Sequence, residues 1–305
     1  MADYGTAGMT RRPQIAFLAD GRRLHLQDGP IDLIIEAKGR KADMRAAHEA
    51  AARRFTGLLD ELCAELAELR KAAPPQYCLL AGVVARRMHA AVAPFAGSQF
   101  ITPMAAVAGS VAEEILGAML AAASLDRAYV NNGGDIALHL AEGEQFTVGL
   151  MDRPDHQGVM RTTVIDAGHP VRGVATSGRH GRSFSLGIAD AVTVLARGAA
   201  QADAAATVIA NAVDLPGHPA IERRPAISLQ PDSDLGPRLV TRAVGRLSAA
   251  EIAAALEAGA CRARGLLQAG LVEGAALCLF GEIIVVGMRE AVAGRSNVLH
   301  QVAVA

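Results

Sequence analysis

The first part of the chain alternates between apolar and polar positions with the period of two that is typical of β-strands. This alternation predicts strands over residues 14–18, 24–26 and 31–36. The dipeptides Asp20-Gly21 and Asp28-Gly29 separate them, and Asp-Gly is a common hairpin turn sequence. The pattern therefore predicts an antiparallel meander.

From residue 43 to residue 72 the apolar positions recur every three or four residues, which predicts one long amphipathic helix. Asp43 is the expected N-cap and Pro74-Pro75 the expected stop. The charged residues between the apolar positions are expected to form a solvated face; they are Arg53, Arg54, Glu61, Glu65 and Glu68.

The remainder of the chain mixes both periods. Helices are predicted over 79–93, 105–123, 199–213 and 248–269, and the first is expected to end at Pro94. Strands are predicted within 128–140 and over 146–151, 159–165, 171–175 and 191–195, with a hairpin at 275–286 that turns at Gly281-Glu282. Residues 152–158 are expected to form a polar loop, and those after 288 an edge strand or tail. Residues 214–247 are expected to form a long irregular connection with room for one short strand.

Composition narrows the possible functions. The 305 residues carry a net charge of −1, and only 3% are aromatic, which disfavours nucleic-acid binding. The four cysteines show no metal-ligand spacing and suit a reducing compartment. The apolar segment 104–123 is interrupted by Glu113-Glu114, and the N-terminus has no apolar core of signal-peptide type. We expect a cytoplasmic protein without membrane association, and the high apolar content suggests a homodimer.

Residues 173–213 hold the densest group of chemically useful side chains. A turn of small residues, Thr176-Ser177-Gly178, precedes a basic loop with Arg179, His180 and Arg182. The loop composition suits an anionic ligand, and His180 could act as a general acid or base. Asp190 is either a further acidic member of the site or simply the residue that starts a strand.

Asp203 and Thr207 lie four residues apart in the predicted helix, so their side chains share a face. A carboxylate and a hydroxyl at this spacing suit Mg²⁺. The alternative is structural: Asp203 favours the positive end of the helix dipole and Thr207 packs.

Two further segments could contact a ligand. Gly133-Gly134 permits positive φ and could present backbone N–H groups, or it could form an ordinary turn before a strand. The small residues up to Ser110 allow either close helix packing or the approach of a flat ligand.

Three motifs in order resemble the FAD:protein FMN transferases, the ApbE family. Residues 202–207 resemble its ADxxxT signature, 131–136 its glycine-glycine-aspartate strand, and 174–178 its ATSG turn. The resemblance implies an α+β, T-fold-like single domain over residues 1–305, with mixed or antiparallel sheets, long flanking helices and two intertwined lobes.

The resemblance also implies a flavin nucleotide, FAD or FMN, and Mg²⁺ held by Asp203 and Thr207. The residues implied to line the nucleotide cleft are Ser110, Asn132, Gly133, Gly134, Asp135, Thr176, Ser177 and Gly178. Arg179, His180 and Arg182 would form the catalytic group at the anionic part of the substrate.

The chain departs from the family in two places. Glu113 stands where the family has a lysine that helps to hold the nucleotide, and the HIIDP-type loop is absent. A carboxylate facing a pyrophosphate would repel it. A divergent branch is therefore expected, and three functions stay open: a Mg²⁺-dependent flavin transferase or FAD-pyrophosphate-cleaving enzyme, an enzyme of another class acting on a small anionic metabolite, and a non-catalytic flavin-binding protein.

Overall fold

The framework of the protein is a nine-stranded antiparallel sheet. The computed structural model describes residues 13–151, 159–287 and 301–303, and the sheet order is β1-β2-β3-β4-β5-β8-β9-β12-β13. The strands are β1 Gln14–Phe17, β2 Leu24–Asp28, β3 Ile31–Lys38, β4 Arg127–Asn132, β5 Asp135–Leu140, β8 Gly173–Ser177, β9 Ala191–Ala196, β12 Gly274–Leu279 and β13 Glu282–Val286. The α+β class and the N-terminal meander are confirmed.

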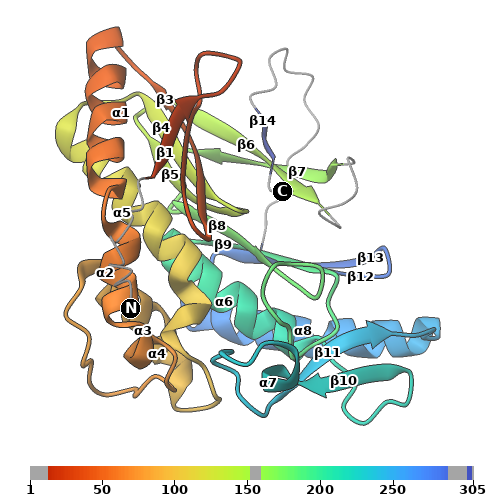
Figure 1. The fold of residues 1–305 in the computed structure, drawn as a ribbon. Helices are drawn as coiled ribbons and strands as arrows, with labels where there is room; N and C mark the ends of the chain where they lie inside the picture. The colour runs from red at the N-terminus through yellow and green to blue at the C-terminus, as the bar shows by residue number, and fades with distance from the viewer. Residues whose placement is uncertain (1–12, 152–158, 288–300, 304–305) are drawn as a thin grey trace, which may run out of the picture.

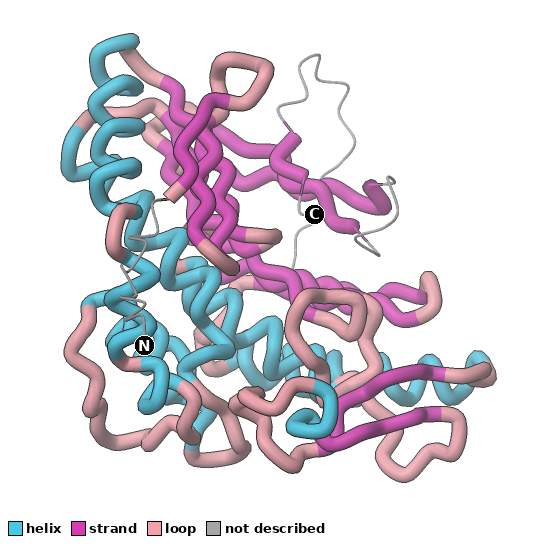
Figure 2. The backbone as a smooth tube through the Cα atoms, viewed as in Figure 1, coloured by secondary structure: helices cyan, strands magenta, loops and turns pink. Residues whose placement is uncertain are grey.

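Helices cover one face of this sheet (Figures 1 and 2). They are α1 Lys41–Phe55, α2 Leu58–Ala64, α3 Leu66–Leu69, α4 Val83–Ala96, the 3₁₀ helix η1 Pro103–Ala106, α5 Val107–Ala122, α6 Ala199–Ala212 and α8 Ala249–Gln268. Helix α5 packs against β4 and β5, while α6 packs against β8 and β9. The two helices that carry the predicted site residues therefore lie side by side over the centre of the sheet.

The other face is partly covered by a small three-stranded sheet. Strands β6 Gln145–Met151 and β7 Val159–Asp166 pair antiparallel, and β14 Gln301–Ala303 pairs with β6. Phe146, Val148 and Ile165 from this sheet form a core with Ile136 and Val174 of the large sheet. The predicted strands at 146–151 and 159–165 are confirmed, whereas the predicted loop 152–158 lies outside the described residues.

The predicted single helix over 43–72 is three helices. Gly57, with φ of 84°, breaks the chain between α1 and α2 in a left-handed conformation. The N-cap of α1 is Arg40, and the side chain of Asp43 binds the Arg40 guanidinium, so the prediction of Asp43 as the cap is wrong. Pro94 lies inside α4 near its end, so it does not stop that helix.

Residues 214–247 are more regular than predicted. Strands β10 Ile221–Pro225 and β11 Leu239–Val244 form a separate antiparallel pair, with α7 Ala226–Leu229 between them. Most of their side chains are exposed, so the sequence lacks the alternation that marks a half-buried strand.

The last helix and hairpin largely follow their sequence signals. The capping box of Ser248 and Glu251 at the start of α8 is confirmed. The hairpin β12–β13 is also confirmed, but its turn residues are Phe280, with φ of 50°, and Gly281.

One helix among the described residues, Pro103–Ala122, has the length and composition of a membrane span. It passes this test although it contains Glu113 and Glu114. In the fold it is the central helix, in contact with α1, α4, α6 and the sheet. Its apolar surface therefore serves the core.

Candidate functional site

The site is built where the N-terminal ends of α5 and α6 cross. A Cβ atom added at Gly109 would lie 2.2 Å from the Ala199 carbonyl oxygen, so only glycine allows this approach. Gly173 on β8 is packed in the same way against Gly198, with 2.1 Å from its added Cβ to the Gly198 carbonyl carbon. The slim stretch before Ser110 thus serves close helix packing.

Asp203 projects from α6 toward the start of α5. Its Oδ2 accepts a hydrogen bond of 3.0 Å from the Gly109 N–H, among the unsatisfied donors of the first turn of α5. Burial raises the pKa of Asp203 to about 7, although the hydrogen bonds from the Gly109 and Ala108 backbone oppose this. The carboxylate is therefore costly to keep charged without a cation nearby.

Asp135 is the second acidic residue of the site. It opens β5 after the two-residue turn Gly133-Gly134, whose φ values are 62° and 109°. Its Oδ1 accepts a hydrogen bond of 3.3 Å from the Thr176 N–H. Burial and repulsion from the Asp203 carboxylate raise the pKa of Asp135 well above the usual range. The hydrogen bond from Thr176 and the charge of Arg182 lower it, but by less. The fold thus brings together two carboxylates that are 68 positions apart in the sequence.

Arg182 is the predicted catalytic residue that lies at the Gly133 turn, just before β5. Its guanidinium lies over the Gly133 turn, where an added Cβ would be 1.8 Å from Nη2. Its Nη1 donates a long hydrogen bond of 3.4 Å to the Pro30 carbonyl, and its charge lowers the pKa of Asp135.

Arg179 and His180 contact a different carboxylate, that of the buried Asp190. Oδ1 of Asp190 accepts bonds from Arg179 Nε at 2.9 Å and from His180 Nε2 at 3.2 Å. Its Oδ2 accepts the Phe280 N–H at 2.5 Å, and the Arg179 guanidinium lies 5.4 Å from the Phe280 ring centroid. The sequence left two roles open for Asp190, a further acidic residue of the site or the start of a strand. In the structure its carboxylate holds this loop in place.

Several predicted cleft residues have structural partners. The buried Asn132 donates to the Ala108 carbonyl at 3.1 Å, Gly134 donates to the Asn131 side chain at 2.8 Å, and Thr176 Oγ1 lies 2.9 Å from Thr193 Oγ1. Gly134 therefore does not offer its N–H to a ligand in this conformation.

The other predicted residues differ in their surroundings. An added Cβ at Gly178 would lie 2.3 Å from the Asp190 carbonyl oxygen, so this glycine fits the packing of its loop. Ser177 and Thr207 are partly buried. The Ser110 hydroxyl is fully buried and has no hydrogen-bond partner among the described residues.

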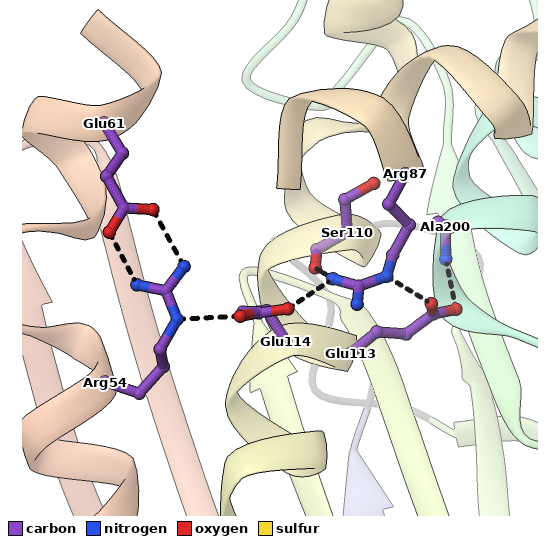
Figure 3. Close-up of polar contacts among 7 residues, drawn as sticks. All are labelled: Arg54, Glu61, Arg87, Ser110, Glu113, Glu114 and Ala200. Atoms are coloured by element: carbon purple, nitrogen blue, oxygen red, sulfur yellow. Dashed lines mark hydrogen bonds and ion pairs between the residues drawn. The ribbon is translucent and has the colours of Figure 1, made fainter. Parts of the chain in front are cut away.

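Glu113 has two partners within the protein at the helix crossing. Its Oε1 accepts a hydrogen bond of 3.0 Å from the Ala200 N–H at the start of α6, and its Oε2 lies 3.3 Å from Arg87 Nε (Figure 3). Helices α5 and α6 therefore cap each other, since Asp203 binds the N-terminal end of α5 and Glu113 that of α6. The expected repulsion between Glu113 and a pyrophosphate is not supported by this geometry.

A chain of ion pairs extends from this cap across the helical layer. Arg87 also binds Glu114 at 2.9 Å, Glu114 binds Arg54 at 2.7 Å, and Arg54 binds Glu61 at 2.8 Å (Figure 3). Arg54 is therefore half-buried between helices rather than part of a simple solvated face. Glu65 likewise leaves that predicted face, because it accepts the N–H groups of Ala81 and Gly82 before α4.

The donor chemistry of the site suits a hard cation. Asp203 and Asp135 carry carboxylate oxygens, and Thr207 lies four residues after Asp203 on α6 and carries a hydroxyl. Within the described ranges no group of three or more His, Cys, Asp or Glu side chains forms a metal cluster. A cation here would need water or ligand oxygens to complete its shell, as Mg²⁺ commonly does.

The chain is similar to several curated proteins. A UPF0280 protein of Methanopyrus kandleri is 43% identical over 129 residues, which cover 42% of this chain and 48% of that protein. A UPF0280 protein of Methanosphaerula palustris is 37% identical over 163 residues, which cover 50% of this chain and 58% of that protein. The chain therefore spans about half the length of the curated relatives it matches.

Among solved structures, the apo form of the flavinyl transferase ApbE from Pseudomonas stutzeri covers 90% of this chain and 94% of its own, with 10% identity and a TM-score of 0.46. The protein-family model described as "AbpE bacteria" matches residues 15–285. Since that match includes all three motifs and most of the chain, the chain belongs to this family, as its resemblance to the ApbE proteins predicted.

Proposed function

We propose that this protein binds a flavin nucleotide together with Mg²⁺ and acts on the pyrophosphate of FAD, either by transferring FMN or by cleaving the bond. One observation carries the proposal: Asp135 and Asp203 are half-buried carboxylates, burial raises the pKa of both, and the Asp203 charge raises the pKa of Asp135 further. A divalent cation between them would relieve both burial and repulsion.

Each residue of the site has a proposed role. Asp203, Thr207 and Asp135 would hold the cation. When bound, Mg²⁺ would supply positive charge to the pyrophosphate oxygens. The Gly133 turn, Thr176 and Ser177 would border the nucleotide, and Arg182 would bind its anionic part. We also propose that the protein is cytoplasmic, which cell fractionation would test, and that it forms a homodimer, which light scattering would test.

A structural role of Asp203 competes with this proposal, since its carboxylate already caps α5. The substitution Asp203→Asn separates the two roles, because asparagine caps a helix about as well as aspartate but brings no charge to a cation. We expect Asp203→Asn to keep most of the stability and to weaken Mg²⁺-dependent binding of FAD at least 10-fold.

The matched control is Glu113→Gln, which removes a carboxylate of the same helix crossing that binds Ala200 and Arg87. Its Mg²⁺ and FAD affinities should equal those of the native protein. Calorimetric titration of FAD in Mg²⁺ buffer, followed by an assay for AMP, measures binding and cleavage separately. Equal FAD affinities in native protein and Asp203→Asn would refute the metal site, and tight FAD binding without AMP release would favour a flavin-binding protein.

An enzyme acting on a small anionic metabolite is the second candidate. The contact between His180 and the buried Asp190 favours it, because such a carboxylate orients an imidazole for proton transfer. If His180 acts in this way, the pH–rate profile of any turnover should lose its step near neutrality in His180→Gln. A step that persists in this variant would exclude the role.

A further inference from the structure

The turn of the β12–β13 hairpin carries an unusual residue. It consists of Phe280 and Gly281, whose φ values are 50° and 82°. Positive φ at both positions is the requirement of a type I′ turn, in which asparagine or glycine is favoured at the first position. Phe280 is the one residue other than glycine with positive φ among those that the structure describes. A bulky side chain in this conformation is strained, and such strain persists where the side chain has a function.

Burial in the core does not offset this strain, because Phe280 is 43% exposed. Its contacts instead fix its position: the backbone N–H donates a hydrogen bond of 2.5 Å to Oδ2 of the buried Asp190, and the Arg179 guanidinium lies 5.4 Å from the ring centroid. Arg179 Nη2 in turn lies 2.6 Å from Oδ1 of the same carboxylate. One buried carboxylate thus holds both the backbone of Phe280 and the cation beside its ring, while the residue stays open to solvent.

Phe280 lies at the same end of the large sheet as the proposed site. Strands β8, β9 and β12 are antiparallel neighbours, so the end of β8, which leads through Ser177 into Gly178, lies on the same side as the end of β12, which leads into Phe280. These strand ends are two strand spacings apart, about 10 Å. Arg179 follows Gly178 directly and reaches the ring, so it connects the nucleotide-bordering turn to Phe280.

We propose that Phe280 is a platform on which a flat aromatic ring of the nucleotide ligand stacks, either the isoalloxazine or the adenine ring. The inference rests on the proposed function and adds the residue that recognises a ring, whereas the groups described above recognise the anionic part. An exposed phenyl ring offers a flat face to another ring system, and rings of either kind have the π-face that stacking requires. Its fixed backbone means that little freedom is lost when the ligand binds.

A substitution that favours the turn but removes the ring separates binding from folding. Phe280→Asn gives the Asn-Gly pair that this turn prefers, so the melting temperature should equal or exceed that of the native protein. Calorimetry in Mg²⁺ buffer measures binding of three probes: FMN, AMP and inorganic pyrophosphate. Affinity for FMN or AMP, whichever carries the stacked ring, should fall about 5- to 100-fold, and affinity for pyrophosphate, which has no ring, should stay unchanged. Phe280→Tyr keeps a ring and should bind all three probes like the native protein.

A second variant reports contact directly. The chain contains no tryptophan, so Phe280→Trp introduces a single fluorescent indole at the proposed platform. Its emission should be strongly quenched when FMN or AMP saturates the protein and unaffected by pyrophosphate. Phe17→Trp is the matched control, because Phe17 is also exposed, at 54%, but lies on β1 at the far edge of the same sheet. Its emission shows the loss due to absorption of light by the free nucleotide.

The outcomes separate this inference from the proposed function. A fall for FMN alone identifies the isoalloxazine as the stacked ring, and a fall for AMP alone identifies the adenine. If Phe280→Asn binds both nucleotides like the native protein, or loses pyrophosphate affinity as well, the platform is wrong while the proposed function stands. Quenching of Phe280→Trp that does not exceed that of Phe17→Trp has the same meaning. If the native protein binds none of these probes and no FAD, both proposals are overturned.

Discussion

Restoring the family's lysine by Glu113→Lys tests whether position 113 faces the nucleotide or supports the fold. In the structure the Glu113 carboxylate accepts the Ala200 N–H at 3.0 Å and lies 3.3 Å from the Arg87 guanidinium. A lysine here would place a positive charge at the positive end of the α6 dipole and beside Arg87. We therefore expect loss of stability without gain of nucleotide binding.

The size of the effect follows from three parts. Loss of the cap costs about 1 kcal/mol, and reversed charge at the helix terminus adds about 0.5–1 kcal/mol. Replacing attraction to Arg87 by repulsion adds about 1 kcal/mol, since both side chains are only partly buried. The total of about 3 kcal/mol corresponds to a fall in melting temperature of roughly 5–10 °C.

The assay is urea unfolding followed by circular dichroism, alongside titration with FAD in Mg²⁺. Glu113→Gln is the matched comparison, since its amide oxygen can still accept the Ala200 N–H, and it should lose about 1 kcal/mol or less. If Glu113→Lys is as stable as the native protein and binds FAD more tightly, then the side chain faces the ligand and the capping role is refuted.

Three further predictions concern packing, capping and pH. Gly109→Ala places a Cβ 2.2 Å from the Ala199 carbonyl oxygen and should lower the free energy of unfolding, measured in urea, by about 2–3 kcal/mol. Gly117→Ala on the same helix meets open space and should raise it by about 0.5–1 kcal/mol. Equal effects of the two substitutions would contradict the close crossing of α5 and α6. Ser248→Ala removes the hydroxyl of the capping box and should cost about 1 kcal/mol, and an unchanged unfolding midpoint would show that the box contributes nothing. Because burial raises the pKa of Asp203 to about 7, the folded metal-free protein keeps a proton that the unfolded chain releases near pH 4, so stability should fall as pH rises from about 4 to 7. Urea unfolding in EDTA at several pH values measures this loss of stability, which should be smaller in Asp203→Asn. Identical pH dependences of the two proteins would contradict the burial of this carboxylate.

The strands and most helices were predictable because their patterns are local. The meander, the capping box of Ser248 and the helix over 199–213 follow from residues within one element. The break at Gly57 and the exposed β10–β11 pair were missed, since a single glycine and a pair of mostly exposed strands leave little periodic signal.

The partners of the charged residues were less predictable. The sequence grouped Arg179, His180 and Arg182 by proximity in the chain, yet Asp190 binds the first two and the Gly133 turn seats the third. The resemblance placed Glu113 at the position of the family's lysine, where it would repel a pyrophosphate, yet this side chain caps a helix that begins 86 residues later. Such pairings depend on side-chain directions across elements, which sequence spacing does not contain.

The sequence by itself determined the family and the α+β class, because both are expressed in short motifs and local periodicity. Only the tertiary structure decided which carboxylates meet. Asp135 lies on a strand and Asp203 on a helix, and they become neighbours because β5 pairs with β8 while glycine allows α5 and α6 to cross at close range. Burial at that crossing raises the pKa of both carboxyl groups, since removal of water disfavours their charged forms.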